Sequence, residues 1–389
     1  MAMTGRERVL ATINHEVPDR VPIIIGASNT TGIKSRAYRK LKEQLGVQSE
    51  ERYLYHWPEL GTVFPDEAVL QRLNSDVRGA HDKFPGYVYE RNEKRPPHTP
   101  YISDWGCASE EVDAGVWFQK THPLEKAETV EDIEKYPFWP DMNDPDRVSH
   151  LKEYTSRLAS ENQYAIMGTP WLLSVFERAM GMQGMDNFLL NMGRNPDFAE
   201  ALLKKIAGLC KTLMGHFLQE CGDNLDIICI GDDLGTQTNL MISPAMYRKI
   251  LKPIHADYIS FIKERTKAKI FLHTDGDVFN LVNDFVEIGV DILNPIQVSA
   301  GKMSNISELK KRFANNLVFC GAIDTHRVLP FGTPEEVRQE VRRVIEVLGQ
   351  GGGYMAASVH TIVDEVPPEN ILAMVDAVSE FGSYPLEDK

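Results

Sequence analysis

The chain has 389 residues, of which 42% are hydrophobic and 25% are charged. This composition is typical of a soluble globular protein, and the length allows two ordinary domains or one large barrel with insertions. The net charge of −14 disfavours nucleic acid and anionic membranes as partners. The five cysteines are scattered without a CxxC pair, so we expect neither a disulfide framework nor a thiolate zinc site.

The N-terminal segment has the pattern of a helix rather than of a signal peptide. Thr4 and Glu7 have the spacing of a capping box, and Arg6 lies where a signal peptide needs apolar residues. The longest apolar runs, such as residues 21–25 and 227–230, are too short to span a membrane. We therefore expect a cytoplasmic protein.

Short apolar runs alternate with helical patterns over the C-terminal two thirds of the chain. Most of the runs are apolar throughout, as expected for parallel strands that are covered on both faces. Strands are predicted at residues 21–26, 165–168, 226–231, 268–273, 290–294, 317–321 and 353–358.

Helices are predicted between these strands. The clearest is 334–348, which has Thr333 as its N-cap, Pro334 at its first position and an apolar stripe with helical spacing. Two further helices are predicted to begin at Ser243-Pro244 and at Pro367-Pro368.

The alternation of strands and helices predicts one α/β domain over residues 1–389. The expected fold is a closed (β/α)8 barrel, and a doubly wound open sheet is the alternative. Residues 50–150 interrupt the alternation because they are rich in proline, aromatic and charged residues. We interpret them as an insertion of hairpins and loops that covers one mouth of the barrel.

Three predicted strands end in residues that can bind a metal. In a barrel, functional residues lie at the carboxyl ends of strands. His273 and Asp275 are two positions apart in an extended segment, so they point to the same side, and Gly276 lets the chain turn directly afterwards. His360, at a later strand end, can complete a zinc site with one open position. Alternatively, His273 hydrogen-bonds a loop and Asp275 caps a helix.

Other residues near the strand ends are candidates for catalysis or substrate binding. Asp232 and Asp233 are the candidate catalytic acids, and capping of a helix is their alternative role. Cys320 and Trp171 have packing in the core as their alternative role. The predicted substrate-binding residues are Asn29, Trp171, Gln297 and Cys320.

One segment of the sequence resembles a corrinoid-binding motif but lacks its glycine. Asp324-Thr325-His326 resembles the Asp-x-His that begins a corrinoid-binding loop, but position 329, where that loop has glycine, is Leu. We therefore expect that this chain does not carry its own cobalamin.

Several segments resemble the uroporphyrinogen decarboxylase superfamily, and the likeness covers nearly the whole chain. These segments are TGRERVLATINHEVPDRVP, GDDLGTQTNLMISPAMYRKILKP, IFLHTDGDV, VDILNPIQ, FCGAIDTHRVLPFGTPEEV and GGGYMAASVHTIVDEVPPENILAMV. The resemblance implies a (β/α)8 barrel and one of two activities, porphyrinogen decarboxylation or corrinoid-dependent methyl transfer. The decarboxylases carry Arg-Gln-Ala-Gly-Arg after the first strand, and this chain has GASNTTGIKSRAYRK there.

The resemblance to the methyltransferases implies a zinc site. Their ligands lie in a His-x-Cys-Gly motif and in a later cysteine, ten residues before an asparagine. Here His273 matches the histidine, Asp275 replaces the first cysteine, and His360 replaces the second, ten residues before Asn370. This harder ligand set favours an oxygen ligand such as an ether oxygen, and loss of the metal is the alternative interpretation.

The resulting hypothesis is a zinc-dependent O-demethylase. It transfers a methyl group from a methoxylated, aromatic substrate to cob(I)alamin on a separate corrinoid protein, and Asp232 or Asp233 delivers a proton. The alternatives are methyl transfer between methylcobalamin and a thiol, decarboxylation of a small acid, and metal-dependent binding without catalysis.

Overall fold

The structure is a computed structural model that describes residues 2–54, 61–93, 99–113, 116–170 and 174–386. Trp171, one of the predicted substrate contacts, lies outside these residues. No helix in the described part of the chain has both the length and the apolar character needed to cross a membrane.

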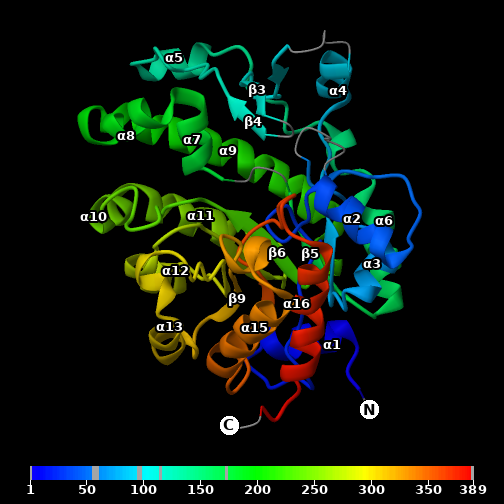
Figure 1. Ribbon diagram of the computed structural model, residues 1–389. Coiled ribbons are helices and arrows are strands. Elements are labelled where there is room, and N and C mark those ends of the chain that lie inside the picture. The colour runs from blue at the N-terminus through cyan, green and yellow to red at the C-terminus, as the bar shows by residue number, and fades with distance from the viewer. Residues whose placement is uncertain (1, 55–60, 94–98, 114–115, 171–173, 387–389) are drawn as a thin grey trace.

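Helices and strands alternate from β5 to the C-terminus (Figure 1). The helices are α1 (Gly5–Ile13), α2 (Ser35–Leu45), α3 (Glu67–Arg72), α4 (Gly86–Glu93), α5 (Val130–Lys135), α6 (Leu151–Glu161), α7 (Phe176–Gln183), α8 (Met185–Arg194), α9 (Pro196–Cys221), α10 (Pro244–Met246), α11 (Lys252–Lys263), α12 (Val282–Glu287), α13 (Ile306–Phe313), α14 (Val328–Phe331), α15 (Pro334–Leu348) and α16 (Pro368–Phe381). The strands are β1 (Val77–Ala80), β2 (Tyr101–Ile102), β3 (Ala108–Asp113), β4 (Val116–Gln119), β5 (Ala165–Gly168), β6 (Ile227–Gly231), β7 (Lys269–His273), β8 (Ile292–Asn294), β9 (Val318–Ile323) and β10 (Tyr354–Ser358).

Seven strands form one parallel sheet in the order β1-β5-β6-β7-β8-β9-β10. Every neighbouring pair in this sheet is parallel. The six strands predicted between residues 165 and 358 are all present, and their bounds differ from the prediction by at most two residues. The continuous apolar runs therefore predicted the parallel sheet correctly.

The predicted N-terminal strand closes this sheet into a barrel. Ile24 N donates to Ala356 O of β10 over 2.9 Å, and Ala356 N donates to Pro22 O over 2.8 Å. On the other side, Asp76 N, directly before β1, donates to Ile23 O over 2.9 Å. The N-terminal segment therefore occupies the eighth position of the ring, and the open-sheet alternative is wrong.

The helix starts that were predicted from capping residues are also present. Thr4 caps α1 and Thr333 caps α15, each with the reciprocal glutamate of a capping box. Ser243 accepts a hydrogen bond from Met246 N at the start of α10, and Pro368 is the first residue of α16. The starts of α1, α10 and α15 are encoded locally because a polar side chain accepts from an N–H group of the first turn, whereas α16 begins at a proline without a side-chain cap.

Strand β1 lies within residues 50–150, where the sequence predicted only an insertion. Its sequence, VRGA, gave no apolar run because it contains Arg78 and Gly79. Arg78 is nevertheless buried, since its guanidinium lies 3.5 Å from the centre of the Tyr164 ring and 2.7 Å from a carboxylate oxygen of Glu67. The part of the chain that leaves the barrel therefore begins after β1.

Strands β2, β3 and β4 form a separate antiparallel sheet in this insertion. Leu124 N, which follows the sheet, donates to Met182 O of α7 over 2.8 Å, and Gln119 Nε2 donates to Gly181 O over 2.5 Å. Figure 1 shows this sheet, with α4 and α5, on the side of the barrel opposite to both termini. Because α7 follows the carboxyl end of β5, the insertion lies at the carboxyl mouth of the barrel.

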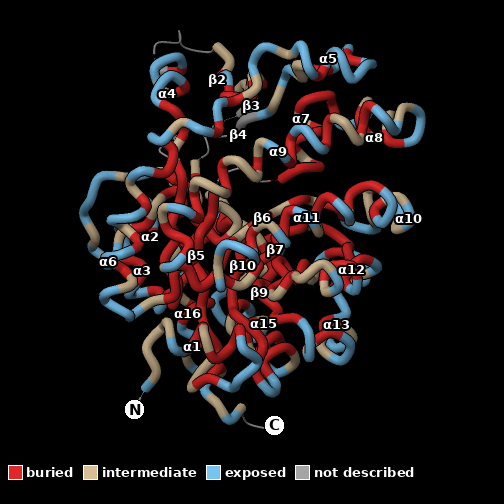
Figure 2. Tube along the Cα trace, turned by 180° about the vertical axis from the view of Figure 1, so that it is seen from behind, coloured by how far each residue is buried: buried red, intermediate tan, exposed pale blue. Residues whose placement is uncertain are grey.

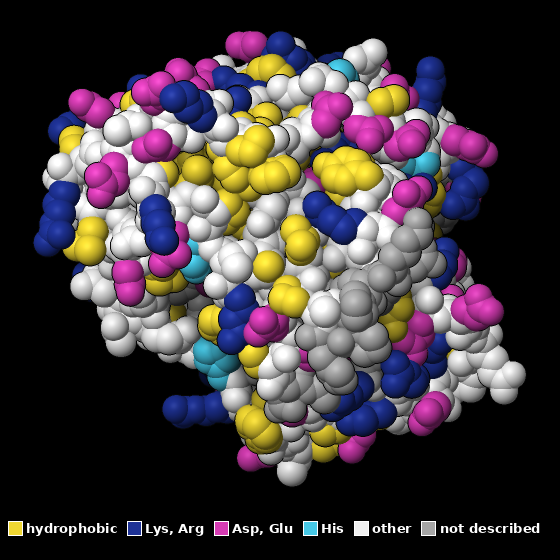
Figure 3. Space-filling model, turned by 90° about the horizontal axis from the view of Figure 1, so that it is seen from above, with side chains coloured by type: hydrophobic (Ala, Val, Ile, Leu, Met, Phe, Trp, Pro, Cys, Tyr) yellow, Lys and Arg dark blue, Asp and Glu magenta, His cyan; other side chains and the backbone are white. Residues whose placement is uncertain are grey.

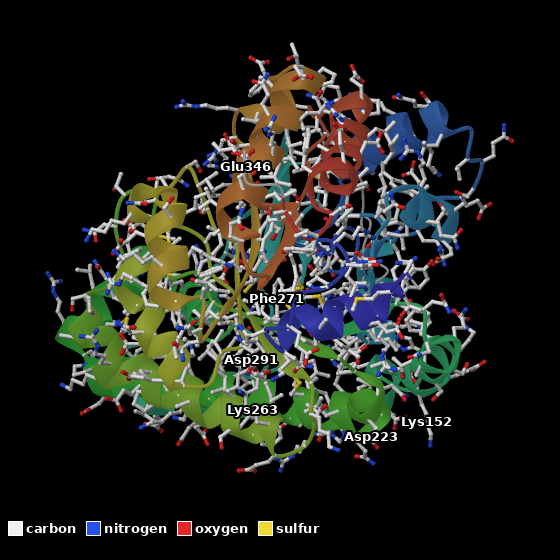
Figure 4. All side chains as sticks on the ribbon, turned by 90° about the horizontal axis from the view of Figure 1, so that it is seen from below. Lys152, Asp223, Lys263, Phe271, Asp291 and Glu346 are labelled. Atoms are coloured by element: carbon white, nitrogen blue, oxygen red, sulfur yellow. The ribbon has the colours of Figure 1, made fainter. Side chains whose placement is uncertain are left out.

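Apolar side chains from every barrel strand fill the interior of the ring. Phe271 of β7 is fully buried among them, and Figure 4 shows it near the centre of the barrel seen from below. Figure 2 shows that the buried residues run along the strands and along the inner faces of the surrounding helices. Since the interior is packed, a ligand has access only at the mouths of the barrel.

Candidate metal centre

The predicted site residues meet at the carboxyl ends of β6, β7 and β10. Gly231, the last residue of β6, is paired with His273, the last residue of β7. Asp233 follows β6, Asp275 follows β7, and His360 follows β10 after Ser358 and Val359. Residues that are far apart in the sequence therefore converge on one place.

The side chains of His273, Asp275 and His360 surround one point. Their potential ligand atoms all lie within 4.8 Å of one another. Oδ2 of Asp275 is 3.8 Å from Nε2 of His273 and 3.8 Å from Nε2 of His360. The two imidazole rings are 5.4 Å apart between their centres and are inclined by 58°. Two imidazole nitrogens and one carboxylate oxygen are an ordinary donor set for zinc with one position open.

The second oxygen of Asp275 supports this interpretation. Oδ1 is buried and has no hydrogen-bond partner among the described residues. A buried carboxylate oxygen without a partner is costly, because desolvation of the charge is not compensated. A cation beside the carboxylate would remove this cost, so the residues present fit a bound zinc ion.

Asn294 at the end of β8 orients the ring of His273. Nδ1 of His273 is 2.7 Å from Oδ1 of Asn294, and Nδ2 of Asn294 donates to Cys320 O over 3.4 Å. Because the amide group uses its NH2 for Cys320, its oxygen must accept from Nδ1–H of the imidazole. This tautomer leaves the lone pair of Nε2 free toward Asp275, as a metal ligand requires. Asn294 is not among the site residues predicted from the sequence.

The surroundings of His360 favour the neutral form of its ring. Loss of solvent around the ring lowers the pKa of His360 below its ordinary value, and the neighbouring His273 lowers it further. The carboxylate of Asp233 acts in the opposite direction. A neutral imidazole offers a nitrogen lone pair, so His360 is ready to bind a metal near neutral pH.

A sharp turn after Asp275 holds the ligand segment in place. Gly276 has φ +88°, and a Cβ atom there would lie 2.3 Å from the carbonyl carbon of Gly235. Its N–H donates to Oε1 of Gln297 over 2.6 Å. Gln297 was predicted to bind substrate, but the structure places its side chain against this turn and outside the cavity wall.

Asp232 lies behind the site and caps α7. Its carboxylate accepts hydrogen bonds from the N–H groups of Val175, Phe176 and Glu177. It also lies 2.9 Å from Nε2 of His255. With these partners and only 1% of its surface exposed, Asp232 serves the alternative role that the sequence allowed, a helix cap.

Asp233 faces the site together with Glu177, a residue that the sequence analysis missed. Asp233 N donates to Oε2 of Glu177 over 3.3 Å, and Oδ1 of Asp233 accepts from Asp275 N over 2.8 Å. Burial raises the pKa of Asp233. The nearby charge of Asp275 raises this pKa as well, whereas His273 lowers it. Burial and the charges of Asp233 and Asp232 raise the pKa of Glu177 well above its ordinary value. The surroundings therefore favour the protonated form of both carboxyl groups more than water does.

A cavity of about 240 Å³ opens beside these groups. Its described wall contains Asn29, Glu177, Asp233 and the two histidines of the ligand set. Asn29, which was predicted to bind substrate, is therefore placed where it can do so. Cys320 is not in this wall, since it is fully buried inside the barrel, and the cysteine that does line the cavity is Cys229.

The chain is similar to known proteins over most of its length. The family model for uroporphyrinogen decarboxylase (URO-D) matches residues 100–381. The uroporphyrinogen decarboxylase of Pseudomonas syringae pv. tomato is 26% identical over 280 residues, which are 70% of this chain and 73% of that protein. The uroporphyrinogen decarboxylase of Pseudoalteromonas translucida is 37% identical over 79 residues, so the chain spans 22% of the length of that relative.

Among solved structures, a methyltransferase from Methanosarcina mazei is similar over nearly the whole chain. The superposition covers 97% of this chain and 99% of that chain with a TM-score of 0.68. Because the sequence identity is only 17%, this similarity shows a shared fold and nothing more.

Proposed function

The chain belongs to the uroporphyrinogen decarboxylase family, and we propose that it acts there as a zinc-dependent methyltransferase. In this proposal it moves a methyl group from an ether oxygen to cob(I)alamin on a separate corrinoid protein. The observation that carries the proposal is the convergence of His273, Asp275 and His360 on one point, with a buried carboxylate oxygen that has no hydrogen-bond partner in the described part of the chain. The methyltransferase fold of the Methanosarcina mazei protein supports it.

The three side chains would hold zinc through Nε2 of each histidine and the carboxylate of Asp275. When bound, zinc supplies a Lewis acid that polarises the ether oxygen of the methyl donor. Asn294 keeps His273 in the tautomer that binds. A site with nitrogen and oxygen ligands is harder than one with two thiolates and therefore favours an oxygen donor over a thiol.

The proposed reaction balances with one proton. The bond between the ether oxygen and the methyl carbon breaks, and its electron pair stays on oxygen. A bond between carbon and cobalt forms with the electron pair of cob(I)alamin, which becomes methylcob(III)alamin. The oxygen takes up a proton, which the carboxyl pair of Asp233 and Glu177 is placed to give because both groups line the cavity.

A protein partner needs a surface near the mouth. Phe331 in α14, which follows β9, is 76% exposed, and Phe118 and Phe138 of the insertion are each 63% exposed. Figure 3 shows apolar side chains gathered on the face opposite to the termini. Large exposed apolar side chains of this kind mark surfaces for protein partners, which is consistent with docking of a corrinoid protein over the mouth.

Decarboxylation is the second candidate, because the curated relatives named above are decarboxylases. Such an enzyme must hold the carboxylates of its substrate, most directly with arginines. No Arg or Lys belongs to the described wall of the cavity. The metal-ligand set and this wall both favour methyl transfer.

The test is methyl transfer in vitro with free cob(I)alamin as the acceptor. Zinc-loaded protein is mixed with cob(I)alamin and a set of methyl ethers, and methylcob(III)alamin is followed by its absorbance. We expect product with the unaltered protein and with His326→Ala, whose exposed histidine lies at the neighbouring strand end outside the ligand set. We expect none with His273→Ala. Product formation that is equal in all three proteins would contradict the role of the metal site.

A further inference from the structure

We propose that a second cavity, at the carboxyl end of β1, is a binding site for a small planar organic carboxylate. This cavity has a volume of about 220 Å³, and its described wall shares no residue with the described wall of the cavity at the metal centre. The proposed methyl transfer makes no use of it. The inference therefore concerns a separate site and does not depend on the proposed function.

Three parts of the chain enclose the second cavity. Gly79 of β1 and His81 directly after it form one side, and Tyr154 of α6 forms another. The third side comes from the segment between α2 and α3, where Phe64 N donates to Arg52 O over 2.7 Å. Figure 1 shows α2, α3 and α6 together on one flank of the barrel. Because Arg52 is exposed and His81 is buried, the cavity leads from the surface to the end of the strand.

Two basic side chains, Arg52 and Lys83, belong to the wall of the second cavity. The guanidinium carbon of Arg52 lies 5.0 Å from the centre of the Phe64 ring, which is also in the wall, so this charge is at the cavity. Lys83 is anchored by its backbone N–H, which donates to Arg147 O over 2.9 Å. Asp82 supplies the one carboxyl group of the described wall. Two positive charges against one negative charge favour an anionic ligand, and the fork of an arginine matches a carboxylate in particular.

Aromatic side chains define the body of the ligand. Tyr53, Phe64 and Tyr154 all belong to the wall of the second cavity. Flat apolar rings pack well against such side chains, in stacked or edge-to-face arrangements. The volume of about 220 Å³ exceeds the roughly 150 Å³ of a cavity that holds one benzene ring, so one ring with a carboxylate fits. A small inorganic anion would leave the aromatic surface without contacts.

His81 separates the second cavity from the cavity at the metal centre. Its Nδ1 contacts Oγ1 of Thr169, which belongs to the wall of the metal-centre cavity. The His81 ring also packs edge-on against Phe64, with 5.7 Å between the ring centres and an angle of 83°. A Cβ atom on Gly79 would lie 2.5 Å from Nε2 of His81, so the ring fits only because position 79 is glycine. These contacts hold the ring in place, and a ligand of one cavity is therefore kept out of the other.

The experiment is calorimetric binding of benzoate to the full chain after dialysis against a chelator, so that no metal can bind the carboxylate. Benzamide, its uncharged counterpart, and inorganic phosphate are the comparison ligands. The variants are Arg52→Gln and Lys83→Gln, and the matched control is Arg36→Gln, which changes an exposed arginine of α2 outside the wall. We expect one benzoate per chain, bound at least about tenfold more tightly than benzamide or phosphate, and a roughly tenfold loss of affinity in each of the two variants. Arg36→Gln and the metal-site variant His273→Ala should bind benzoate as the unaltered protein does.

Each other outcome would overturn a stated part of the inference. The absence of saturable benzoate binding would overturn the site itself. Equal affinities for benzoate and benzamide would overturn the role of the two cations, and tighter binding of phosphate would replace the planar carboxylate by an inorganic oxyanion. Affinity that is lost in a folded His273→Ala but retained in Arg52→Gln and Lys83→Gln would place benzoate at the metal centre instead. None of these results depends on whether the protein transfers methyl groups.

Discussion

His273 is held by Asn294, whose amide oxygen lies 2.7 Å from Nδ1 of the imidazole. The two residues are direct neighbours in the register of β7 and β8, and Asn294 is fully buried. Because this contact fixes the tautomer, Asn294→Ala should weaken zinc binding by roughly 10- to 100-fold. Competition with a chromogenic chelator measures the change. Asn283→Ala, which alters an exposed asparagine of α12, is the control and should bind zinc normally.

Zinc should stabilise the folded chain, because the ligand set forms only when β7 and β10 are assembled. At a zinc concentration about 100 times Kd, binding contributes about 2.7 kcal/mol to the free energy of unfolding. For a chain of this length the expected rise in Tm is roughly 3 °C, measured by differential scanning calorimetry with and without a chelator. Asp275→Asn should lose most of this rise. A rise of equal size in the variant would contradict the assignment of Asp275 as a ligand.

Asp232 should matter for stability rather than for the metal. Asp232→Ala removes the acceptor for three N–H groups of α7 and the partner of His255. We expect a loss of about 3 kcal/mol in the free energy of unfolding, measured by urea denaturation, with unchanged zinc content. Lost zinc at unchanged stability would instead place Asp232 in the reactive site.

The carboxyl group of Glu177 should make stability depend on pH. Burial and the neighbouring acids raise the pKa of Glu177 in the folded state, so its protonated form stabilises the fold at low pH. This contribution is complete below the unfolded pKa of about 4.3 and is lost as the pH rises through the folded value. Glu177→Gln removes the dependence, so its Tm relative to the unaltered protein should increase between about pH 5 and pH 8.

The control for this experiment is Glu153→Gln, which changes an exposed acid in the first turn of α6. Its Tm relative to the unaltered protein should not vary over the same range of pH. A difference in Tm between Glu177→Gln and the unaltered protein that is constant with pH would show that Glu177 is ionised in the folded state.

The sequence predicted the barrel because its strands are short apolar runs and its helix starts are capped by local residues. Strand β1 could not be found in this way, since Arg78 is buried through contacts with Tyr164 and Glu67 that exist only in the folded chain. The barrel closure likewise depends on hydrogen bonds between the N-terminal segment and β10. Local patterns therefore predict elements, whereas their long-range partners come from packing.

The same distinction holds for the candidate site. His273 and Asp275 were found because alternate residues of an extended segment share one side, and His360 because it ends another strand. Asn294 ends the strand next to β7, so pairing of strand ends was a signal that the sequence offered. Glu177 gave no such signal, because it faces the cavity only through the capping of α7 by Asp232, which lies far along the chain.

The most direct test of the central claim is the metal content of the purified protein after it has been supplied with zinc and dialysed. We expect about one zinc ion per chain in the unaltered protein and in His326→Ala, and almost none in His273→Ala and His360→Ala. Circular dichroism should show that all four proteins are folded. Zinc that is absent from the unaltered protein, or that is retained in both ligand variants, would contradict the proposed metal centre.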